Sequence, residues 1–330
     1  MAVRWITGAQ VRQLLDMDSC IAAMRRVMVQ TSRGEVIVPP RSALRLASGD
    51  LFALMPGAMN RDTGAEPELF GIKLISLFHD NPAAGLPSHL GLVVLFEGEH
   101  GQPTAILGAA EVTAIRTAAA SALATDVLAR PNTPVLALLG TGDQAISHLA
   151  ALARVRQFNE IRIWGRAPEK VEAFIAAHRA SAPGLRPVAT VREAVAKADV
   201  VCTLTGAGEP ILRGAWLAPG CHVNLVGASQ PARAEADAEV VTRTRFFVDY
   251  RQSAFDEAGE LLMAIEAGLI TRDHVCGELG EVIAGEVPGR RDERDITVYK
   301  SLGFAAQDLA ACDLVARRAA AQDIGVMLEL

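Results

Sequence analysis

The feature that most constrains the fold is a regular alternation of apolar runs and amphipathic stretches after residue 133. TPVLALLG and EIRIWG are short apolar runs, and TGDQAISHLAALARV and APEKVEAFIAAHRAS have helical spacing. Strands of a parallel sheet are buried on both faces, so they are nearly continuous in apolar residues and are joined by crossing helices. The pattern therefore predicts an α/β fold with a doubly wound parallel sheet.

A glycine-rich turn, GTGDQA, lies directly after the first of these strands and directly before the first helix. Gly140 permits a tight turn, Gly142 lets the backbone approach a pyrophosphate, and Ala145 allows close packing of helix on sheet. The free N–H groups at the helix start suit phosphates. The turn therefore predicts a Rossmann dinucleotide site, and its cofactor-binding candidates are Gly140, Thr141, Gly142, Asp143 and Gln144.

The end of the second strand indicates which dinucleotide binds. NAD sites usually place an acid there for the ribose 2′-hydroxyl, whereas an arginine accommodates a 2′-phosphate. This chain has WGRA at residues 164–167 and no acid before Glu169. Arg166 therefore favours NADP, with NADPH as the preferred form, and NAD remains the alternative.

The remainder of the chain predicts a second, α+β domain. Residues 8–32 have helical spacing, and short apolar runs separated by Gly, Pro, Asn and Asp continue to about residue 108. An alanine-rich helix over 109–129 joins the two domains. The last segment, YKSLGFAAQDLAACDLVARRAAAQ, is expected to be a helix that packs on the N-terminal domain. The predicted domains are residues 1–118 with 304–330 for substrate and dimerisation, and residues 119–303 for the dinucleotide.

Composition and charge exclude several classes of function. The net charge of -6 lacks the basic footprint of a nucleic-acid binder. No apolar run is long enough to cross a membrane, and the N-terminus has no secretory apolar region. The five cysteines are widely spread, which fits a reducing compartment. The histidines lack metal-ligand spacing. We expect a cytoplasmic protein without a catalytic metal, a membrane partner or a nucleic-acid partner.

Several stretches in order along the chain resemble the ornithine cyclodeaminase/mu-crystallin family. They are VPPRSAL, GIKLIS, IRTAAASALA, LLGTGDQA, RIWGR, ADVVCTLT, VNLVGAS, GELGEVIAG and YKSLGFAAQDLA. The resemblance implies a nicotinamide-dependent enzyme that dimerises through its N-terminal sheet domain, which the C-terminal helix completes.

This family contains ammonia-releasing cyclodeaminases as well as ketimine reductases and enzymes similar to alanine dehydrogenase. The cyclodeaminase pattern has an Asp after the late Rossmann strand, where this chain has Ser229. The difference makes the chain similar to the mu-crystallin-like ketimine reductases. Cyclodeaminase, alanine dehydrogenase and non-catalytic NADP-linked binding protein remain the alternatives.

Three cations lie inside elements that should be partly buried. Arg41 follows Pro39-Pro40, Lys73 lies in the apolar run FGIKLISLF, and Arg116 lies in the alanine-rich helix. A buried cation is costly unless it is paired or binds an anion, so each is either a structural ion pair or part of an anion pocket. The resemblance implies the second: Arg41 and Arg116 hold a substrate carboxylate, and Lys73 donates or relays the proton.

The resemblance supplies the remaining site candidates. His89 and Ser229 would contact the substrate. Asp308 is expected to be a surface or capping carboxylate. The remaining cofactor contacts are Thr117, Thr203, Val226, Ser301, Leu302 and Gly303.

Together these features predict an NADPH-dependent reductase of carboxylated imines, such as Δ1-pyrroline-2-carboxylate or Δ1-piperideine-2-carboxylate, that gives an L-amino acid. The catalytic residues would be Lys73, Arg116 and Arg41.

Overall fold

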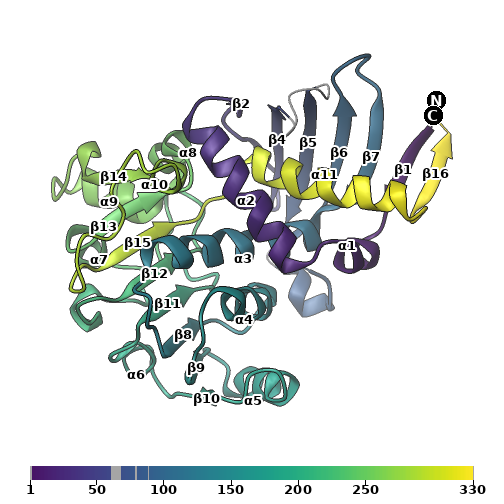
Figure 1. Ribbon diagram of the computed structural model, residues 1–330. Helices are drawn as coiled ribbons and strands as arrows, with labels where there is room; N and C mark the ends of the chain where they lie inside the picture. Colours follow the sequence, from purple (N-terminus) through teal and green to yellow (C-terminus); the bar gives the residue numbers. More distant parts are fainter. Residues whose placement is uncertain (1, 61–67, 79, 88, 330) are drawn as a thin grey trace. The chain divides into compact units, whose positions relative to one another are not determined.

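The computed structural model describes residues 2–60, 68–78, 80–87 and 89–329. The chain forms two compact units (Figure 1). Unit 1 comprises residues 1–116 and 303–330, and unit 2 comprises residues 117–302. The boundary falls inside helix α3 (Ala109–Leu128).

Unit 1 is built on one mostly antiparallel sheet. Its strands are β1 (Ala2–Ile6), β2 (Val36–Ile37), β3 (Ser42–Arg45), β4 (Leu51–Met59), β5 (Leu69–Leu77), β6 (His89–Glu97), β7 (Pro103–Gly108) and β16 (Val326–Glu329). The order is β16-β1-β7-β6-β5-β4-β2, and β3 also pairs with β4. The helices are α1 (Gly8–Leu14), α2 (Met17–Ser32), α11 (Ala305–Ala321) and a 3-10 turn over Asn81–Ala84.

The N-terminal segment differs from the single helix that its spacing predicts. Thr7 caps α1 in a reciprocal capping box with Gln10. The helix then ends at Leu14, and Asp16 caps a separate helix, α2, through the N–H of Ser19. An N-capping aspartate has extended backbone, so it interrupts the helical path even where the apolar spacing continues. The edge strand β16 and its neighbour β1 were not predicted.

Helix α11 covers one face of this sheet, and it packs against β4, β5, β6 and α2 (Figure 1). The covered face of β5 carries Leu69, Gly71, Lys73 and Ile75, all buried. An added Cβ on Gly71 would lie 2.9 Å from Cδ2 of Leu309 on α11. Glycine therefore lets the helix approach the strand closely, above the position of Lys73.

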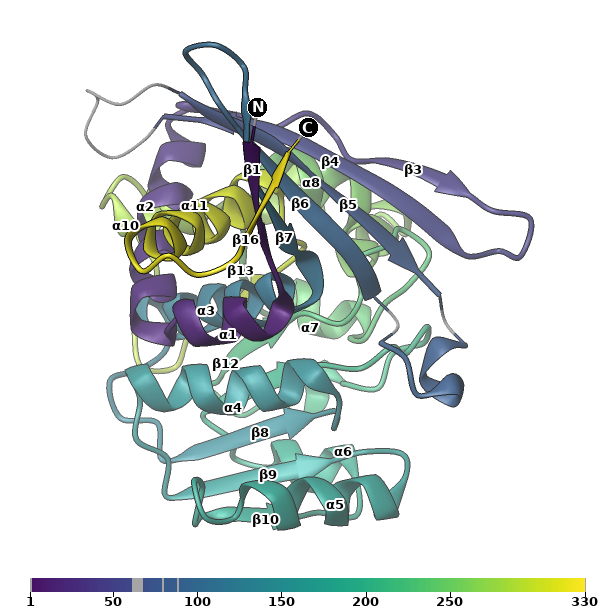
Figure 2. The ribbon, with the colours of Figure 1, turned by 90° about the vertical axis from the view of Figure 1, so that its right-hand side faces the viewer.

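The opposite face of the same sheet is apolar, and no described helix of unit 1 covers it (Figure 2). Across β4, β5 and β6 the rows Ala58–Phe70–Phe96, Pro56–Ile72–Val94 and Leu54–Leu74–Leu92 lie side by side. The rings of Phe70 and Phe96 stack at 5.2 Å. We call these nine residues the open apolar face.

Unit 2 has the predicted parallel sheet. Its strands are β8 (Val135–Leu139), β9 (Glu160–Trp164), β10 (Leu185–Pro187), β11 (Val200–Thr203), β12 (His222–Leu225), β13 (Arg245–Val248), β14 (Val275–Glu278) and β15 (Thr297–Lys300). Its helices are α4 (Asp143–Val155), α5 (Pro168–His178), α6 (Val191–Val195), α7 (Ala238–Thr242), α8 (Arg251–Glu257), α9 (Gly259–Glu266) and α10 (Leu279–Ile283), with 3-10 turns at Gly214–Trp216 and Arg272–His274. The order β10-β9-β8-β11-β12-β15-β13-β14 is doubly wound, so the predicted α/β fold class is confirmed.

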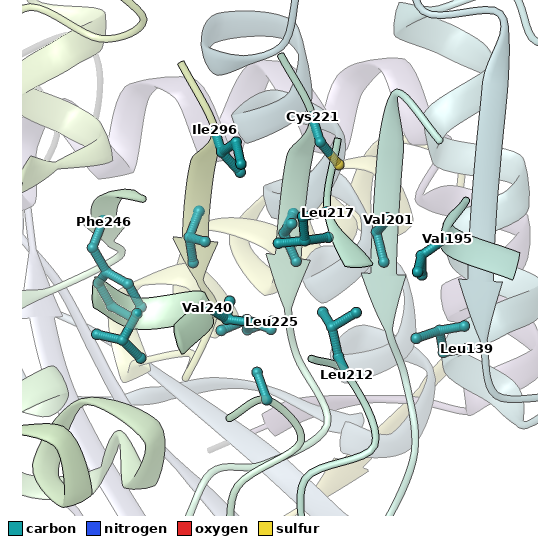
Figure 3. Close-up of a cluster of buried hydrophobic side chains, with 14 of the residues drawn as sticks. Leu139, Val195, Val201, Leu212, Leu217, Cys221, Leu225, Val240, Phe246 and Ile296 are labelled. Atoms are coloured by element: carbon teal, nitrogen blue, oxygen red, sulfur yellow. The ribbon is translucent and has the colours of Figure 1, made fainter. Parts of the chain in front are cut away.

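The sheet of unit 2 is held by apolar side chains that leave its faces and pack under the connecting helices. Figure 3 shows Leu139, Val201, Leu225 and Phe246 in one such cluster. Tyr299 and Lys300, predicted as the start of the last helix, instead end β15, which lies between β12 and β13 and is buried throughout. The helix begins only at Ala305, after the left-handed residue Gly303.

Among the described residues, no helix combines the length and the apolar character that a membrane crossing requires.

Candidate active site

A buried lysine–aspartate pair forms the centre of unit 1. Lys73 is 2% exposed and Asp308 is 0% exposed. Lys73 Nζ lies 3.1 Å from Asp308 Oδ1 and 3.0 Å from Oδ2, and it also donates to Thr113 Oγ1 at 3.2 Å. Strand β5 points Lys73 toward α11, and α11 supplies the carboxylate. Two elements more than two hundred residues apart in the chain therefore create this pair.

The surroundings of this pair alter both of its pKa values. Burial lowers the pKa of Lys73 to about 8, with Asp308 opposing the decrease and Arg116 and Arg41 contributing to it. Burial acts to raise the pKa of Asp308, but the positive charges of Arg116 and Lys73 outweigh burial and keep it below its usual value. Lys73 is therefore a cation at neutral pH whose proton can be lost at moderate cost.

Arg116 binds the same carboxylate from α3. Its Nε donates to Asp308 Oδ1 at 2.9 Å, and its Nη1 donates to Gln307 Oε1 at 2.8 Å. Its Nη2 has no partner among the residues that the structure describes. Part of the guanidinium fork is thus already used by the protein, and one edge is available to an anion.

Arg41 lies at the start of the β3 region and is half-buried. Its Nη2 donates to the carbonyl oxygen of Gly303 at 3.0 Å. Gly303 has φ +75, and a Cβ there would lie 2.3 Å from Arg116 Nη1. The backbone at Gly303 therefore lies between the two arginines, which explains why this residue has no side chain.

Asp308 corrects the sequence-based expectation. It is not a surface or capping carboxylate but the fully buried partner of Lys73 and Arg116. The sequence did contain a signal, because Ala305, Asp308, Leu309 and Cys312 follow the i, i+3, i+4, i+7 spacing of a buried helix face. A carboxylate inside such a stripe indicates buried cations nearby.

The structure does not bring His89 into this cluster. Lys73 pairs with Val93 in the sheet, and Leu77 pairs with His89. The imidazole is thus four residues further along the same face, roughly 13 Å away at ordinary strand rise. His89 is exposed at the start of β6.

Unit 2 carries the glycine-rich turn at the carboxyl end of β8. Gly140 has φ +131, and its N–H donates to the carbonyl of Trp164 at 2.8 Å. A Cβ on Gly140 would lie 2.5 Å from the Leu204 carbonyl oxygen, whereas a Cβ on Gly142 would meet nothing within 4 Å. Gly142 is the N-cap of α4 and gives no side-chain cap. The open helix start at Gly142 leaves room for a phosphate.

The other predicted cofactor residues of unit 2 gather at the same sheet edge. Leu139, Thr203, Leu225 and Lys300 form one paired row across β8, β11, β12 and β15. The candidates at this edge are Thr203 within the row, and Val226, Ser301 and Leu302 just beyond it. Ligands of doubly wound sheets bind outside these carboxyl ends.

Buried polar atoms at this edge support a ligand there. Gln144 Oε1 and Ser301 Oγ are among those with no hydrogen-bond partner in the described residues. Buried polar atoms are nearly always paired, so each requires a partner that the chain does not supply. Together with the open turn at Gly142, they fit a bound dinucleotide. Thr117 is buried in α3, one turn before Ser121, which bonds His148 of α4 at 2.9 Å.

Arg166 and Ser229 occupy loops after β9 and β12. Arg166 is exposed, and it has no hydrogen bond or ion pair with another described residue. Gly165 before it packs near the turn, since its Cβ would lie 3.0 Å from Thr141 Cγ2. Arg166 is thus beside the dinucleotide turn with its guanidinium available. Ser229 is half-buried.

Within the described residues, one group could bring three metal-ligand atoms together: Glu97, Glu99 and His100, at the β6–β7 hairpin. The Glu97 carboxylate already accepts the backbone N–H groups of Glu99, His100 and Gln102. The grouping is therefore explained by the turn.

The same chain matches the model of the ornithine cyclodeaminase/mu-crystallin family over residues 4–323. The chain belongs to this family. The mouse ketimine reductase mu-crystallin is 38% identical over 282 residues, which cover 86% of this chain and 85% of the relative. The Δ1-pyrroline-2-carboxylate reductase of Bacillus cereus is 30% identical over 327 residues, with 98% and 99% covered.

Solved structures of family members agree in fold. The Thermococcus litoralis Δ1-pyrroline-2-carboxylate reductase, in complex with NADH and L-proline, has a TM-score of 0.93 at 28% identity and covers 98% of this chain and 99% of its own. An archaeal alanine dehydrogenase dimer with bound NAD also has a TM-score of 0.93, at 29% identity with 100% of both chains covered. These relatives confirm the expected enzyme class, a nicotinamide-dependent oxidoreductase that acts on C=N or CH–NH groups.

Proposed function

We propose that this protein is an NADPH-dependent reductase of carboxylated imines. The observation that carries the proposal is the excess of buried positive charge in unit 1. Lys73 and Arg116 both pair with one carboxylate, Asp308. Two buried cations against one anion leave a positive site, and a small anionic substrate neutralises such a site.

The two arginines would bind the substrate carboxylate. Arg116 has its Nη2 edge available, and Asp308 and Gln307 prevent the rest of its guanidinium from turning. Arg41 is fixed on the carbonyl of Gly303. A carboxylate that bridges two fixed guanidinium groups has a defined orientation, which is the contribution that positioning makes to catalysis.

Lys73 would supply the proton. An imine accepts a hydride readily only when its nitrogen is protonated, and a lysine whose pKa is about 8 is mostly protonated at pH 7. Asp308 binds the ammonium group through both carboxylate oxygens and so orients it. Asp308 and Thr113 both accept hydrogen bonds from Nζ and so hold the ammonium group in place, from which it would donate a proton to the substrate nitrogen.

The residues that would hold the cofactor are the turn Gly140–Gln144, the helix start at Asp143, and the polar atoms of Ser301 and Gln144. A bound nicotinamide supplies the hydride. Arg166 would bind a 2′-phosphate through a charge-assisted contact, which supports NADPH over NADH. The nearest acid, Glu169, lies in the first turn of α5 and is exposed.

The open apolar face supports a homodimer as the working form. Nine apolar residues on three neighbouring strands, uncovered within unit 1, form the kind of surface that marks a protein interface. The alanine dehydrogenase relative is a dimer in its structure. A second copy that packs on this face would bury all nine side chains in a symmetric contact.

The named relatives and the charge of the site support the proposed substrate class. Cyclic ketimines such as Δ1-pyrroline-2-carboxylate and Δ1-piperideine-2-carboxylate carry a carboxylate next to the C=N bond, and their reduction gives L-proline and L-pipecolate. The test is the loss of reduced-nicotinamide absorbance with each ketimine, with NADPH and then NADH. Rapid oxidation with NADPH preferred supports the proposal, and no oxidation of either cofactor refutes it.

Lys73→Met separates catalysis from binding in the same assay. The variant keeps an unbranched side chain that is one atom shorter and has no proton to donate, so it should bind NADPH and lose turnover. Retained turnover would remove Lys73 from the mechanism. A matched control is Lys170→Met, which changes an exposed lysine on α5 and should leave both properties unchanged.

Alanine dehydrogenase activity is the second candidate, because the Archaeoglobus fulgidus alanine dehydrogenase is 30% identical over 97% of this chain. The imine of pyruvate and ammonia also carries a carboxylate beside C=N, so the same cation cluster would accept it. Oxidation of reduced cofactor with pyruvate and ammonia, at a higher kcat/KM than with the cyclic ketimines, would favour this candidate.

A further inference from the structure

A second buried charge cluster lies in unit 2, and the proposed reaction does not use it. Glu235, Glu260 and Lys300 are 0%, 2% and 0% exposed. Glu260 Oε2 lies 2.7 Å from Lys300 Nζ, and Glu260 Oε1 accepts the backbone N–H of Glu235 at 3.0 Å. The ammonium group of Lys300 pairs with Glu260, so Glu235 needs other donors to remain buried.

These donors come from two loops at the carboxyl edge of the sheet. Glu235 Oε1 accepts the backbone N–H of Thr205 at 2.8 Å and its hydroxyl at 2.6 Å, and Oε2 accepts the N–H of Gly227 at 2.6 Å. Lys300 Nζ donates to the carbonyl of Ala228 at 2.6 Å. The Gly227–Ala228 segment is therefore fixed at both ends by charged groups, which form the stronger class of hydrogen bond.

The two loops lie on one side of the dinucleotide site. Thr205 follows β11 and Gly227 follows β12, next to β8 with its glycine-rich turn. In a doubly wound sheet the half with that turn and the strand after it bind the adenosine half of the cofactor. The β11–β12 side then receives the nicotinamide half.

The contact between these loops is too close for another side chain. A Cβ on Gly227 would lie 2.1 Å from the carbonyl oxygen of Thr205 and 2.6 Å from the Glu235 carboxyl group. Glu235 thus fills the space between the two loops from the inside of the unit. Ser229, two residues further along the chain, takes its position from this fixed segment.

We propose that Glu235 is a positioning residue for the nicotinamide half of the dinucleotide site, an inference that rests on the proposed function. Its carboxylate fixes the loops after β11 and β12 relative to each other. A carboxylate is required because each of its oxygens faces a backbone N–H. A glutamine has one accepting oxygen, so its amide N–H₂ would face either Thr205 or Gly227 and lose that bond.

Binding of the whole cofactor and of its adenosine half tests this role. The affinities of the full chain for NADPH and for 2′,5′-ADP are measured by calorimetric titration. Glu235→Gln should lower the affinity for NADPH at least about tenfold, which is the usual effect of an unpaired buried donor. The affinity for 2′,5′-ADP should stay within about twofold of the native value. Glu209→Gln removes the same charge from an exposed position in the loop after β11, and it should change neither value.

The outcomes separate the two proposals. A wild-type chain that binds neither NADPH nor NADH refutes the proposed function. A wild-type chain that binds NADPH, with Glu235→Gln binding it equally well, overturns the positioning role. An equal loss of affinity for NADPH and for 2′,5′-ADP also overturns it, because the substitution then disturbs the whole dinucleotide site and not its nicotinamide half alone.

A milder variant covers the case in which Glu235→Gln does not fold. Thr205→Val removes the hydroxyl donor and leaves both backbone donors to Glu235 in place. It should lower the affinity for NADPH about threefold or more and leave the affinity for 2′,5′-ADP unchanged, since one of the three hydrogen bonds from the loops to Glu235 is lost. Unchanged NADPH affinity in this folded variant contradicts the inference.

Discussion

Asp308→Asn tests the central claim that a buried carboxylate sets the acidity of Lys73. The substitution keeps the shape of the side chain and removes its charge at 3.0 Å from Lys73 Nζ. A carboxylate next to a titrating cation usually changes its pKa by about one to three units. The pKa of Lys73, about 8 in the native protein, should therefore fall to roughly 5 to 7 in the variant.

The loss of activity follows from the protonated fraction of Lys73. At pH 7.5 that fraction should decrease by about threefold to about 200-fold, and kcat for imine reduction should decrease with it. The substrate KM should change little, because loss of the carboxylate charge and loss of the Lys73 proton cancel and the net charge of the site stays the same. The assay is a pH profile of kcat/KM, in which the decrease near pH 8 should move to lower pH in the variant.

Asp313→Asn is the matched control. Asp313 also lies on α11, is 5% exposed, and pairs with Arg317 at 2.9 Å. It should leave the alkaline side of the profile unchanged. Asp308→Asn also removes the carboxylate partner of Arg116, which stays charged, so the free energy of unfolding should fall by about 3–5 kcal/mol. An Asp308→Asn profile that matches the native one would refute the reasoning.

Three further predictions address the cofactor, the assembly and acid stability. Arg166→Ala should lower kcat/KM for NADPH about tenfold or more and leave NADH unchanged, as measured by initial rates; an equal loss for both cofactors would contradict a 2′-phosphate contact. Leu74→Glu, in the open apolar face, should convert a dimer to monomers in light scattering, whereas Glu99→Gln in the β6–β7 turn should not. His148 and His222 are fully buried, and burial lowers their pKa values to about 4 and about 3. In the unfolded chain these histidines bind protons near pH 6.5, so protonation favours unfolding as the pH falls. The free energy of unfolding, measured by urea titration, should therefore fall by about 2 kcal/mol per histidine between pH 7.5 and pH 5. His148→Gln should make this decrease smaller, and an unchanged decrease would exclude His148 as a cause.

The parts of the fold that were predicted are those in which local pattern and tertiary environment agree. β8 and β11 are apolar without interruption because both faces of a parallel sheet are covered, and that shows in the sequence. β1 and β16 were missed because they pair with each other from opposite ends of the chain, with Ala2 opposite Glu329. Short strands of this kind gain their structure from such partners and not from their own residues.

The candidate site divides in the same way. Arg41, Lys73 and Arg116 stood out because a cation in an apolar element is unusual in any fold. Asp308 did not, because an acid near a helix start is ordinary and its burial depends on two other elements. Glu235 was missed for a similar reason: its partners are mainly backbone N–H groups of distant loops, which have no mark in the sequence.

The discontinuity of unit 1 has a consequence for synthesis of the chain. Unit 2 is one continuous segment, so all of its strands have been made before α11 leaves the ribosome. Lys73 and Arg116 are made early, yet their carboxylate partner is supplied by α11, near the end of the chain. Until then the nascent protein carries two cations that cannot be buried, and the first sheet must wait for its covering helix. A chain whose synthesis stops before residue 305 therefore has, in the N-terminal part of unit 1, both an uncovered sheet and cations without their carboxylate partner. Chaperones and proteases would act on the chain in this state.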